Sequence, residues 1–127
     1  MILGLGLDLV DVARMARILD GPPARAERFV ARVFTPGERS FCDARADRAS
    51  RYAARFAAKE AALKALGVPR GLRFHELEVV RDEGAPVLSL AGAAAEAARR
   101  IGVERLHLSI THDGGIAAAV VVAEGGP

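Results

Sequence analysis

Residues 55–67 read RFAAKEAALKALG, and the rest of the chain is organised around this stretch. Its alanines and leucines, without proline or a β-branched residue, predict a helix that a final glycine closes. Arg55 and Lys59 are four residues apart, as are Glu60 and Lys64, so each pair lies on one side of the helix. Such a helix is either a solvated face with good ion pairs or a working surface for an anion and a metal. Taken alone, this stretch favours the solvated face.

The N-terminal residues 2–10, ILGLGLDLV, are apolar apart from two glycines and Asp8. They predict a strand. Asp8 needs a partner there, because an unpaired buried carboxylate is costly. It could cap the following helix, pair with a core arginine, or bind a ligand. The glycines lack the third member of a dinucleotide fingerprint, so we expect them to let another backbone or a ligand approach closely.

The remaining pattern predicts an α+β fold, a single domain over residues 1–127 with a largely antiparallel sheet wrapped around a long central helix. The central helix is expected from about residue 49 to residue 66. We expect other helices at 11–19, 24–33, 35–46 and 92–101, strands at 77–81, 86–90, 103–110 and 116–123, and turns at 82–85 and 113–115. Strand 116–123 is rich in valine and small residues, and we expect it to be buried on both faces.

The composition excludes several classes of protein. Of 127 residues, 51% are hydrophobic and 27% charged, which is typical of a soluble globular protein. A net charge of +2 and 5% aromatic residues disfavour nucleic-acid binding, despite a pI of about 9.2. One cysteine, Cys42, excludes an internal disulfide and a multi-cysteine zinc site. Without a long apolar run or a basic leader, we expect no membrane segment and a cytoplasmic location.

Three polar sets stand out from apolar surroundings. They are Asp8; the charged residues Arg55, Lys59, Glu60 and Lys64; and Ser109, Thr111 and His112 at the end of a strand. Two carboxylates, with water and phosphate oxygens, form the hard oxygen shell that Mg²⁺ favours. Neighbouring cations can hold a diphosphate. Each set also has an ordinary structural explanation, so the residues alone suggest a magnesium-and-phosphate site without naming a reaction.

At the same three places the chain resembles the holo-[acyl-carrier-protein] synthases. GLGLDLVDVARM resembles the opening motif of that family, RFAAKEAALKALG its central motif and LHLSITHDGGIAAAVVVAE its closing motif. FTPGER is similar to the family's stretch before its third helix. The motifs occur in order over a chain of the usual length, so the resemblance is specific.

The resemblance implies transfer of the 4′-phosphopantetheine arm from coenzyme A to a serine of apo-acyl-carrier protein. The other product would be adenosine 3′,5′-bisphosphate, and the setting fatty-acid or polyketide biosynthesis. Asp8 and Glu60 would bind the cofactor Mg²⁺, and Lys64 would complete the catalytic set beside the diphosphate. The family also implies the 4′-phosphopantetheinyl transferase fold and a homotrimer with active sites between subunits, with no nucleic-acid or membrane partner.

The resemblance extends to the residues that would contact each substrate. Contacts with coenzyme A are expected from Arg55, Lys59, Lys64, Gly84, Pro86, Ser109, Thr111 and His112. The acidic carrier protein would dock on Arg14, Met15 and Arg17, where cations can steer it. Arg70 takes the place of a basic residue after the central helix.

The acceptor of the carrier serine's proton stays open between two main choices. It is Glu60 itself or a metal-bound water held by Asp8 or Glu60, with Glu38 as a weaker alternative. Two other functions compete with transfer: a module that binds coenzyme A or a carrier without catalysis, and a small nucleic-acid-binding domain. The pairing of Asp8 with Glu60 speaks against the first, because simple binding needs no metal.

Overall fold

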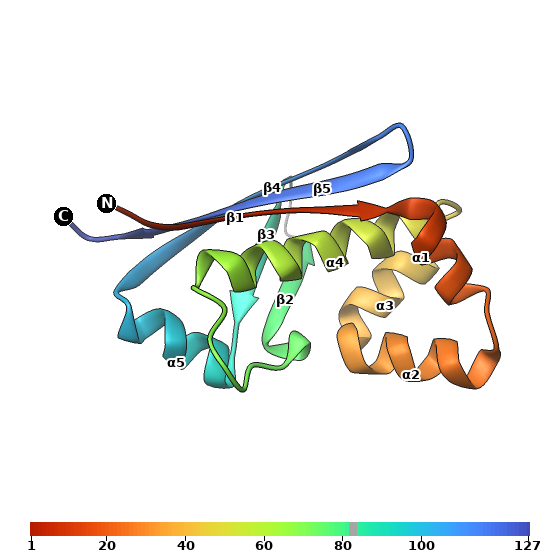
Figure 1. The fold of residues 1–127 in the computed structure, drawn as a ribbon, viewed down its shortest axis with the longest axis horizontal. Coiled ribbons are helices and arrows are strands. Elements are labelled where there is room, and N and C mark those ends of the chain that lie inside the picture. Colours follow the sequence, from red (N-terminus) through yellow and green to blue (C-terminus); the bar gives the residue numbers. More distant parts are fainter. Residues whose placement is uncertain (82–83) are drawn as a thin grey trace.

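The computed structural model describes residues 1–81 and 84–127. The elements follow in the order β1 (Ile2–Asp11), α1 (Val12–Leu19), α2 (Pro23–Val33), α3 (Pro36–Asp43), α4 (Arg48–Ala65), the 3₁₀ helix η1 (Phe74–Glu76), β2 (Leu77–Arg81), β3 (Pro86–Leu90), α5 (Gly92–Arg100), β4 (Val103–Asp113) and β5 (Ile116–Gly125) (Figure 1). The expected α+β class and order of elements are confirmed. The turn expected at 82–85 lies partly outside the described residues.

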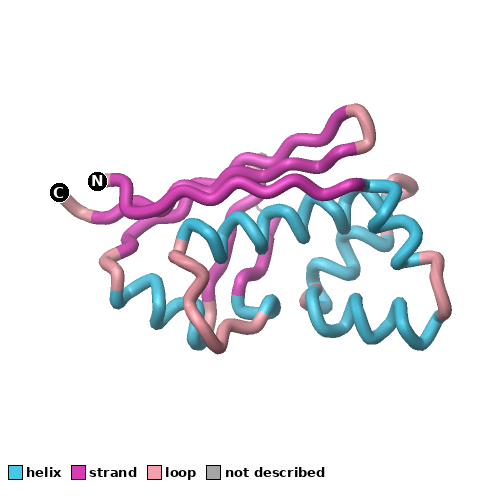
Figure 2. Tube along the Cα trace, viewed as in Figure 1, coloured by secondary structure: helices cyan, strands magenta, loops and turns pink. Residues whose placement is uncertain are grey.

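The strands form two antiparallel sheets, one with the order β1-β5-β4 and one made of β2 and β3. Figure 2 shows the three long strands running side by side along α4. Gly114 and Gly115, with φ of 58° and 81°, make the tight turn between β4 and β5. This turn keeps Asp113 paired with Ile116. Strand β4 is therefore longer than expected, and Thr111 and His112 lie within it.

Helix α4 is central because its alanines pack against both sheets. Ala57, Ala58 and Ala61 are fully buried, and their cluster includes Leu77 of β2 and Val121 of β5. A second cluster lies beneath the helices α1 to α3, around Phe34, Cys42 and Tyr52. None of the helices in the described ranges is both long and apolar enough to cross a membrane.

The glycines of β1 allow this strand to lie directly on α4. A Cβ atom at Gly4 would lie 1.9 Å from the carbonyl oxygen of Ala65, and one at Gly6 would lie 1.7 Å from that of Ala61. No real side-chain carbon fits at such distances, which confirms that the GLG sequence permits close approach of another backbone.

We expect Gly6→Ala to lower the free energy of unfolding by about 3 kcal/mol, because the added methyl group must push β1 away from α4. Urea denaturation measures the loss. Gly67→Ala is the matched control: Gly67 has φ of 80° but no atom within 4 Å of an added Cβ, so only the backbone cost of about 1 kcal/mol remains. Equal losses in the two variants would contradict this packing.

The same contacts establish which way the side chains of β1 point. Successive side chains alternate across a strand, so Asp8 points toward α4, as Gly6 does. Leu5, Leu7 and Leu9 point away and are 64%, 59% and 65% exposed. An unusual row of leucines therefore faces outward from the edge of the three-stranded sheet.

Strand β5 continues this outer face, with Val120 and Val122 in register with Leu7 and Leu5. Its burial alternates, with one face buried and the other half-buried. The expectation that the strand is buried on both faces is therefore wrong for the single chain. Helix α4 covers only the inner face, so the apolar outer face is left uncovered in one chain.

Candidate active site

Two carboxylates from different elements meet beside α4. Asp8 of β1 and Glu60 of α4 line the same cavity, of about 300 Å³. Burial raises the pKa of Glu60, and the negative charge of Asp8 raises it further, while Lys64 acts in the opposite direction. The two carboxylates therefore interact electrostatically, which favours a positive ligand between them.

Lys64 joins this pair from the next turn of the helix. Its Nζ lies 3.2 Å from Oδ1 of Asp8 and donates to the carbonyl oxygen of Leu7 at 2.9 Å. Within the described residues its ion pair is with Asp8 and not with Glu60, which stands four residues earlier. Because nearly half of the Lys64 side chain is exposed, the cation remains accessible to an anionic ligand.

The donor set of this site suits Mg²⁺. In the part of the chain that the structure describes, no group of three His, Cys, Asp or Glu side chains could hold a metal by itself. Mg²⁺ is commonly bound by one or two carboxylates, with water and substrate phosphates in its other positions. Asp8 and Glu60 supply that number of hard oxygen ligands, and a cation would relieve the repulsion that raises the pKa of Glu60.

The same cavity is also lined by apolar side chains and by one cation. Met15, Phe29 and Phe56 contribute the apolar surface, and Arg14 of α1 contributes the cation. Arg14 also lines a neighbouring hollow with Arg17. Met15 is only 2% exposed, so it belongs to the core and cavity wall rather than to the outer surface expected of a docking residue.

A second cavity, of about 170 Å³, is strongly basic. Its lining residues include Arg51, Arg55, Arg81, Pro86 and His112. Arg55 is only 5% exposed, and its Nε has no hydrogen-bond partner among the described residues. Burial lowers the pKa of Arg55. A buried guanidinium that forms no ion pair within residues 1–81 and 84–127 makes this cavity suited to a phosphate group.

Sequence reasoning identified Arg55, Pro86 and His112 but missed Arg51 and Arg81. The spacing of Arg51 and Arg55, four residues apart on one helix, was a usable signal. It also missed Phe41, whose ring centre lies 3.8 Å from the Arg55 guanidinium carbon. A cation–aromatic contact between two helices has no sequence spacing that predicts it.

Lys59 does not lie in either cavity. It is fully buried, its Nζ lies 2.7 Å from Oε1 of Glu38, and it donates to the carbonyl oxygens of Phe74 and Leu77. Burial lowers its pKa, and Glu38 opposes that effect. The ammonium is thus enclosed by protein, so the expected contact between Lys59 and a phosphate does not fit this structure.

Glu38 is occupied on both carboxylate oxygens. Besides the ion pair with Lys59, Oε1 accepts from the backbone N–H of Thr35 at 2.9 Å, and Oε2 accepts from that of Val79 at 2.8 Å. Thr35 and Glu38 form the capping box expected at the start of α3. With 1% exposure, Glu38 cannot reach a substrate, and it is dropped as an alternative general base.

The remaining expected residues lie apart from the carboxylates. Ser109 pairs in register with the outward-facing Val120, and Thr111, two residues later, faces the same way. Asp8 faces α4, so one chain does not bring these hydroxyls and its carboxylates together. Gly84, with φ of 97°, stands just before β3, beside Pro86.

Comparisons with known proteins agree over almost the whole chain. Residues 4–121 match the family model of the 4′-phosphopantetheinyl transferase superfamily. A holo-[acyl-carrier-protein] synthase of Anaeromyxobacter dehalogenans strain 2CP-C is 70% identical over 125 residues, which cover 98% of each chain.

Solved structures show the same fold. The crystal structure of holo-ACP-synthase from Plasmodium yoelii has a TM-score of 0.84 and 30% identity, over 100% of this chain and 98% of that one. The Helicobacter pylori holo-[acyl-carrier-protein] synthase, solved in complex with coenzyme A, has a TM-score of 0.80 and 32% identity, over 94% and 99% of the two chains.

Proposed function

Because the chain belongs to the 4′-phosphopantetheinyl transferase superfamily, and within it to the holo-[acyl-carrier-protein] synthases, we propose that it transfers 4′-phosphopantetheine from coenzyme A to a serine of apo-acyl-carrier protein. The observation that carries this proposal is the cavity lined by Asp8 and Glu60, with the ammonium group of Lys64 paired to Asp8 beside it. A pair of hard oxygen ligands beside a cation suits the transfer of a phosphoryl group from a diphosphate.

The proposed step exchanges one phosphorus–oxygen bond for another. The serine oxygen of the carrier attacks the phosphorus of the phosphopantetheine arm, and the bond from that phosphorus to adenosine 3′,5′-bisphosphate breaks. Glu60 accepts the serine proton, directly or through a water. Lys64, paired with Asp8, would balance the charge of the diphosphate. Mg²⁺ held by Asp8 and Glu60 would supply further neutralisation of that charge.

The basic second cavity fits the nucleotide end of coenzyme A. Arg55 and His112, with Arg81, would hold a phosphate of the nucleotide, and Pro86 with Gly84 would border its adenine. Such charge-assisted bonds to phosphate are strong because guanidinium donors match its oxygens.

We propose that the two cavities work together across a subunit interface in a homotrimer. The exposed outer face with Leu5, Leu7 and Leu9 is the kind of apolar patch that another subunit covers. A neighbouring copy can then present Ser109 and Thr111 from that face to the coenzyme held beside Asp8. A cytoplasmic location remains a prediction.

Transfer is tested by the intact mass of an apo-acyl-carrier protein after incubation with this protein, coenzyme A and Mg²⁺. The expected result is the gain of one phosphopantetheine group, abolished by a chelator. No mass gain with Mg²⁺ present would sink the proposal. Tight coenzyme binding without any mass gain would instead support a non-catalytic binding module.

Docking of the acidic carrier is tested by reversing charge on α1. We expect Arg14→Glu with Arg17→Glu to raise the KM for the carrier about tenfold, close to 1.4 kcal/mol, with little change in the KM for coenzyme A. Arg100→Glu on α5 makes the same kind of change at a distant exposed site and is expected to have no effect. Equal effects at both sites would point to bulk charge rather than docking.

A further inference from the structure

The basic cavity contains one cation that the protein itself encloses. Arg55 is 5% exposed, whereas Arg81 and His112 on the same cavity are exposed. Within residues 1–81 and 84–127, the Nε of Arg55 has no hydrogen-bond partner and its guanidinium group forms no ion pair. A flat group at the end of a flexible side chain needs another support if it is to keep one direction. An aromatic ring of α3 provides that support.

The ring of Phe41 lies against this guanidinium group. The guanidinium carbon of Arg55 lies over the ring at 3.8 Å from its centre, and that of Arg45 lies over it at 3.4 Å. Two groups so close to one ring centre fit only on its opposite faces, because each distance is close to van der Waals contact. Phe41 is therefore stacked between two guanidinium groups, and each contact is a cation–π attraction.

The side of the stack away from Arg55 is fixed. Phe41 is half-buried and packs against the hydrophobic cluster beneath the helices α1 to α3. Arg45, which follows α3, also donates a hydrogen bond from Nη1 to the carbonyl oxygen of Phe41. The ring and the guanidinium group of Arg45 thus hold each other in place, and the free face of the ring gives Arg55 a defined position.

The same ring gathers positive charge at the cavity. The guanidinium carbon of Arg81 lies 5.7 Å from the ring centre, within the range of a cation–π contact. Burial lowers the pKa of Arg55, and the positive charges of Arg45 and Arg51 lower it further. An anion in the cavity would relieve this repulsion. The lining residues of the cavity include Arg55 and Arg81 but not Phe41, so the ring can act on such an anion only through the arginines.

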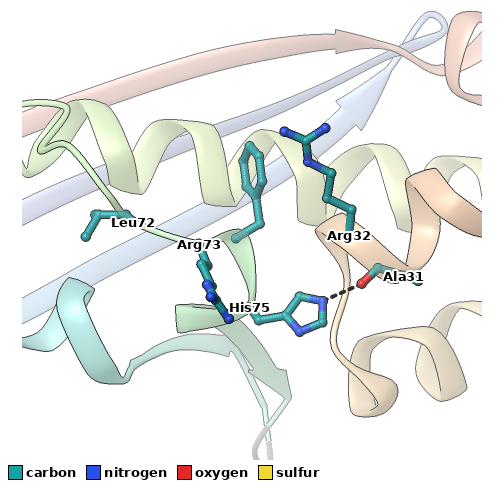
Figure 3. A pocket seen from close by; sticks show the side chains of 6 residues that line it. Ala31, Arg32, Leu72, Arg73 and His75 are labelled. Atoms are coloured by element: carbon teal, nitrogen blue, oxygen red, sulfur yellow. Dashed lines mark hydrogen bonds between the residues drawn. The ribbon is translucent and has the colours of Figure 1, made fainter.

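A cavity between α2 and η1 shows how arginines lie without such a support. It has a volume of about 400 Å³, and Arg32 and Arg73 line it. Both arginines are exposed, and Figure 3 shows their side chains extending in different directions. They do not converge on one point. Two arginines on a cavity wall are therefore not enough to build a phosphate site, and the stack on Phe41 distinguishes the basic cavity.

From these contacts we propose that Phe41 is a positioning residue for the transfer reaction. Its ring, stacked between Arg45 and Arg55, holds the Arg55 guanidinium group in the direction in which it meets a phosphate of the nucleotide. The inference rests on the proposed function, which assigns the nucleotide end of coenzyme A to the basic cavity. A guanidinium group that is held before binding loses less conformational entropy when the phosphate arrives.

The test is calorimetric titration of the whole protein with adenosine 3′,5′-bisphosphate. We expect Phe41→Leu to weaken binding of the bisphosphate at least about tenfold, because the guanidinium group loses its support. Phe41→Tyr keeps the ring and should bind the bisphosphate as the wild type does. Phe74→Leu is the matched control, because it removes a half-buried ring that does not line the basic cavity, and it should change the affinity less than about twofold.

Two further changes separate the support of Arg55 from packing. In an Arg55→Gln background, Phe41→Leu should weaken the bisphosphate by less than a further factor of about two, because the supported group is already gone. A trifluorinated phenylalanine at position 41 keeps the ring but removes most of the negative charge of its face. It is expected to weaken the bisphosphate at least about threefold, and it tests the proposal even if Phe41→Leu fails to fold.

The outcomes distinguish this role from the transfer reaction. Wild-type affinity in Phe41→Leu, or equal weakening by this change with and without Arg55, would overturn the positioning role and leave the nucleotide site intact. Failure of the wild-type protein to bind the bisphosphate would overturn the assignment of the basic cavity, and the positioning role with it. The mass gain of the carrier tests transfer separately.

Discussion

Glu60→Gln is expected to lower the rate of phosphopantetheine transfer at least about 100-fold, the scale on which the loss of one charged catalytic group is usually felt. The amide keeps the size of the side chain but removes the carboxylate charge that we propose binds Mg²⁺ and accepts the serine proton. The measurement is carrier mass gain over time with saturating coenzyme A and Mg²⁺. Glu104→Gln, an exposed surface change, should leave the rate unchanged.

The same variant is expected to keep or gain stability. Burial and Asp8 raise the pKa of Glu60, so the folded chain binds this proton more tightly than the unfolded chain does. The free energy of unfolding therefore falls as the pH rises from the ordinary pKa of a glutamate to the raised pKa that Glu60 has in the folded chain. Glu60→Gln removes that pH-dependent loss. If transfer and stability fell together, Glu60 would be a structural residue rather than a catalytic one.

Lys59→Met is expected to cost about 3–5 kcal/mol of stability, because it leaves the carboxylate of Glu38 buried without its counter-ion. The carbonyl oxygens of Phe74 and Leu77 also lose their donor. Urea unfolding measures the loss. Lys64→Met is the matched control: this lysine is 48% exposed, and its exposed ion pair is worth at most about 1 kcal/mol.

A second change separates charge from packing at Lys59. The double variant Glu38→Gln with Lys59→Met has no charge left at this buried pair, and a glutamine can still accept from the N–H of Thr35 or Val79. We expect it to recover more than half of the stability that Lys59→Met loses. A double variant no more stable than the single one would mean that the lost packing and carbonyl donors, and not the unpaired charge, dominate.

Features set by interactions between residues close in sequence could be predicted, whereas those set by tertiary contacts could not. Alanine content and spacing predicted α4, and the glycines of β1 predicted its close approach to another backbone. The convergence of Asp8 with Glu60 was expected from the motifs. The partner of Lys64 was not, because a local i,i+4 rule names Glu60, whereas tertiary packing brings Asp8 of β1 within 3.2 Å.

Burial explains the other departures. A lysine in the middle of a charged motif reads as a surface residue, but the side of α4 that carries Lys59 is packed against β2 and Glu38. The face of the sheet on which Ser109 lies depends on the register of β4 with β5. The sequence of one strand alone does not determine that register. Spacing alone therefore groups residues that one chain holds on opposite faces.

The central claim is that the carboxylate cavity of one subunit and the basic cavity of another form one transfer site. It is tested by mixing two variants, Glu60→Gln and Arg81→Ala with His112→Ala, unfolding them together and refolding the mixture. Each variant alone is expected to be inactive. In a randomly mixed trimer, about a quarter of the interfaces pair two intact cavities, so about a quarter of the wild-type rate should return. A refolded mixture as inactive as its components, with mixed trimers present by mass, would contradict the claim.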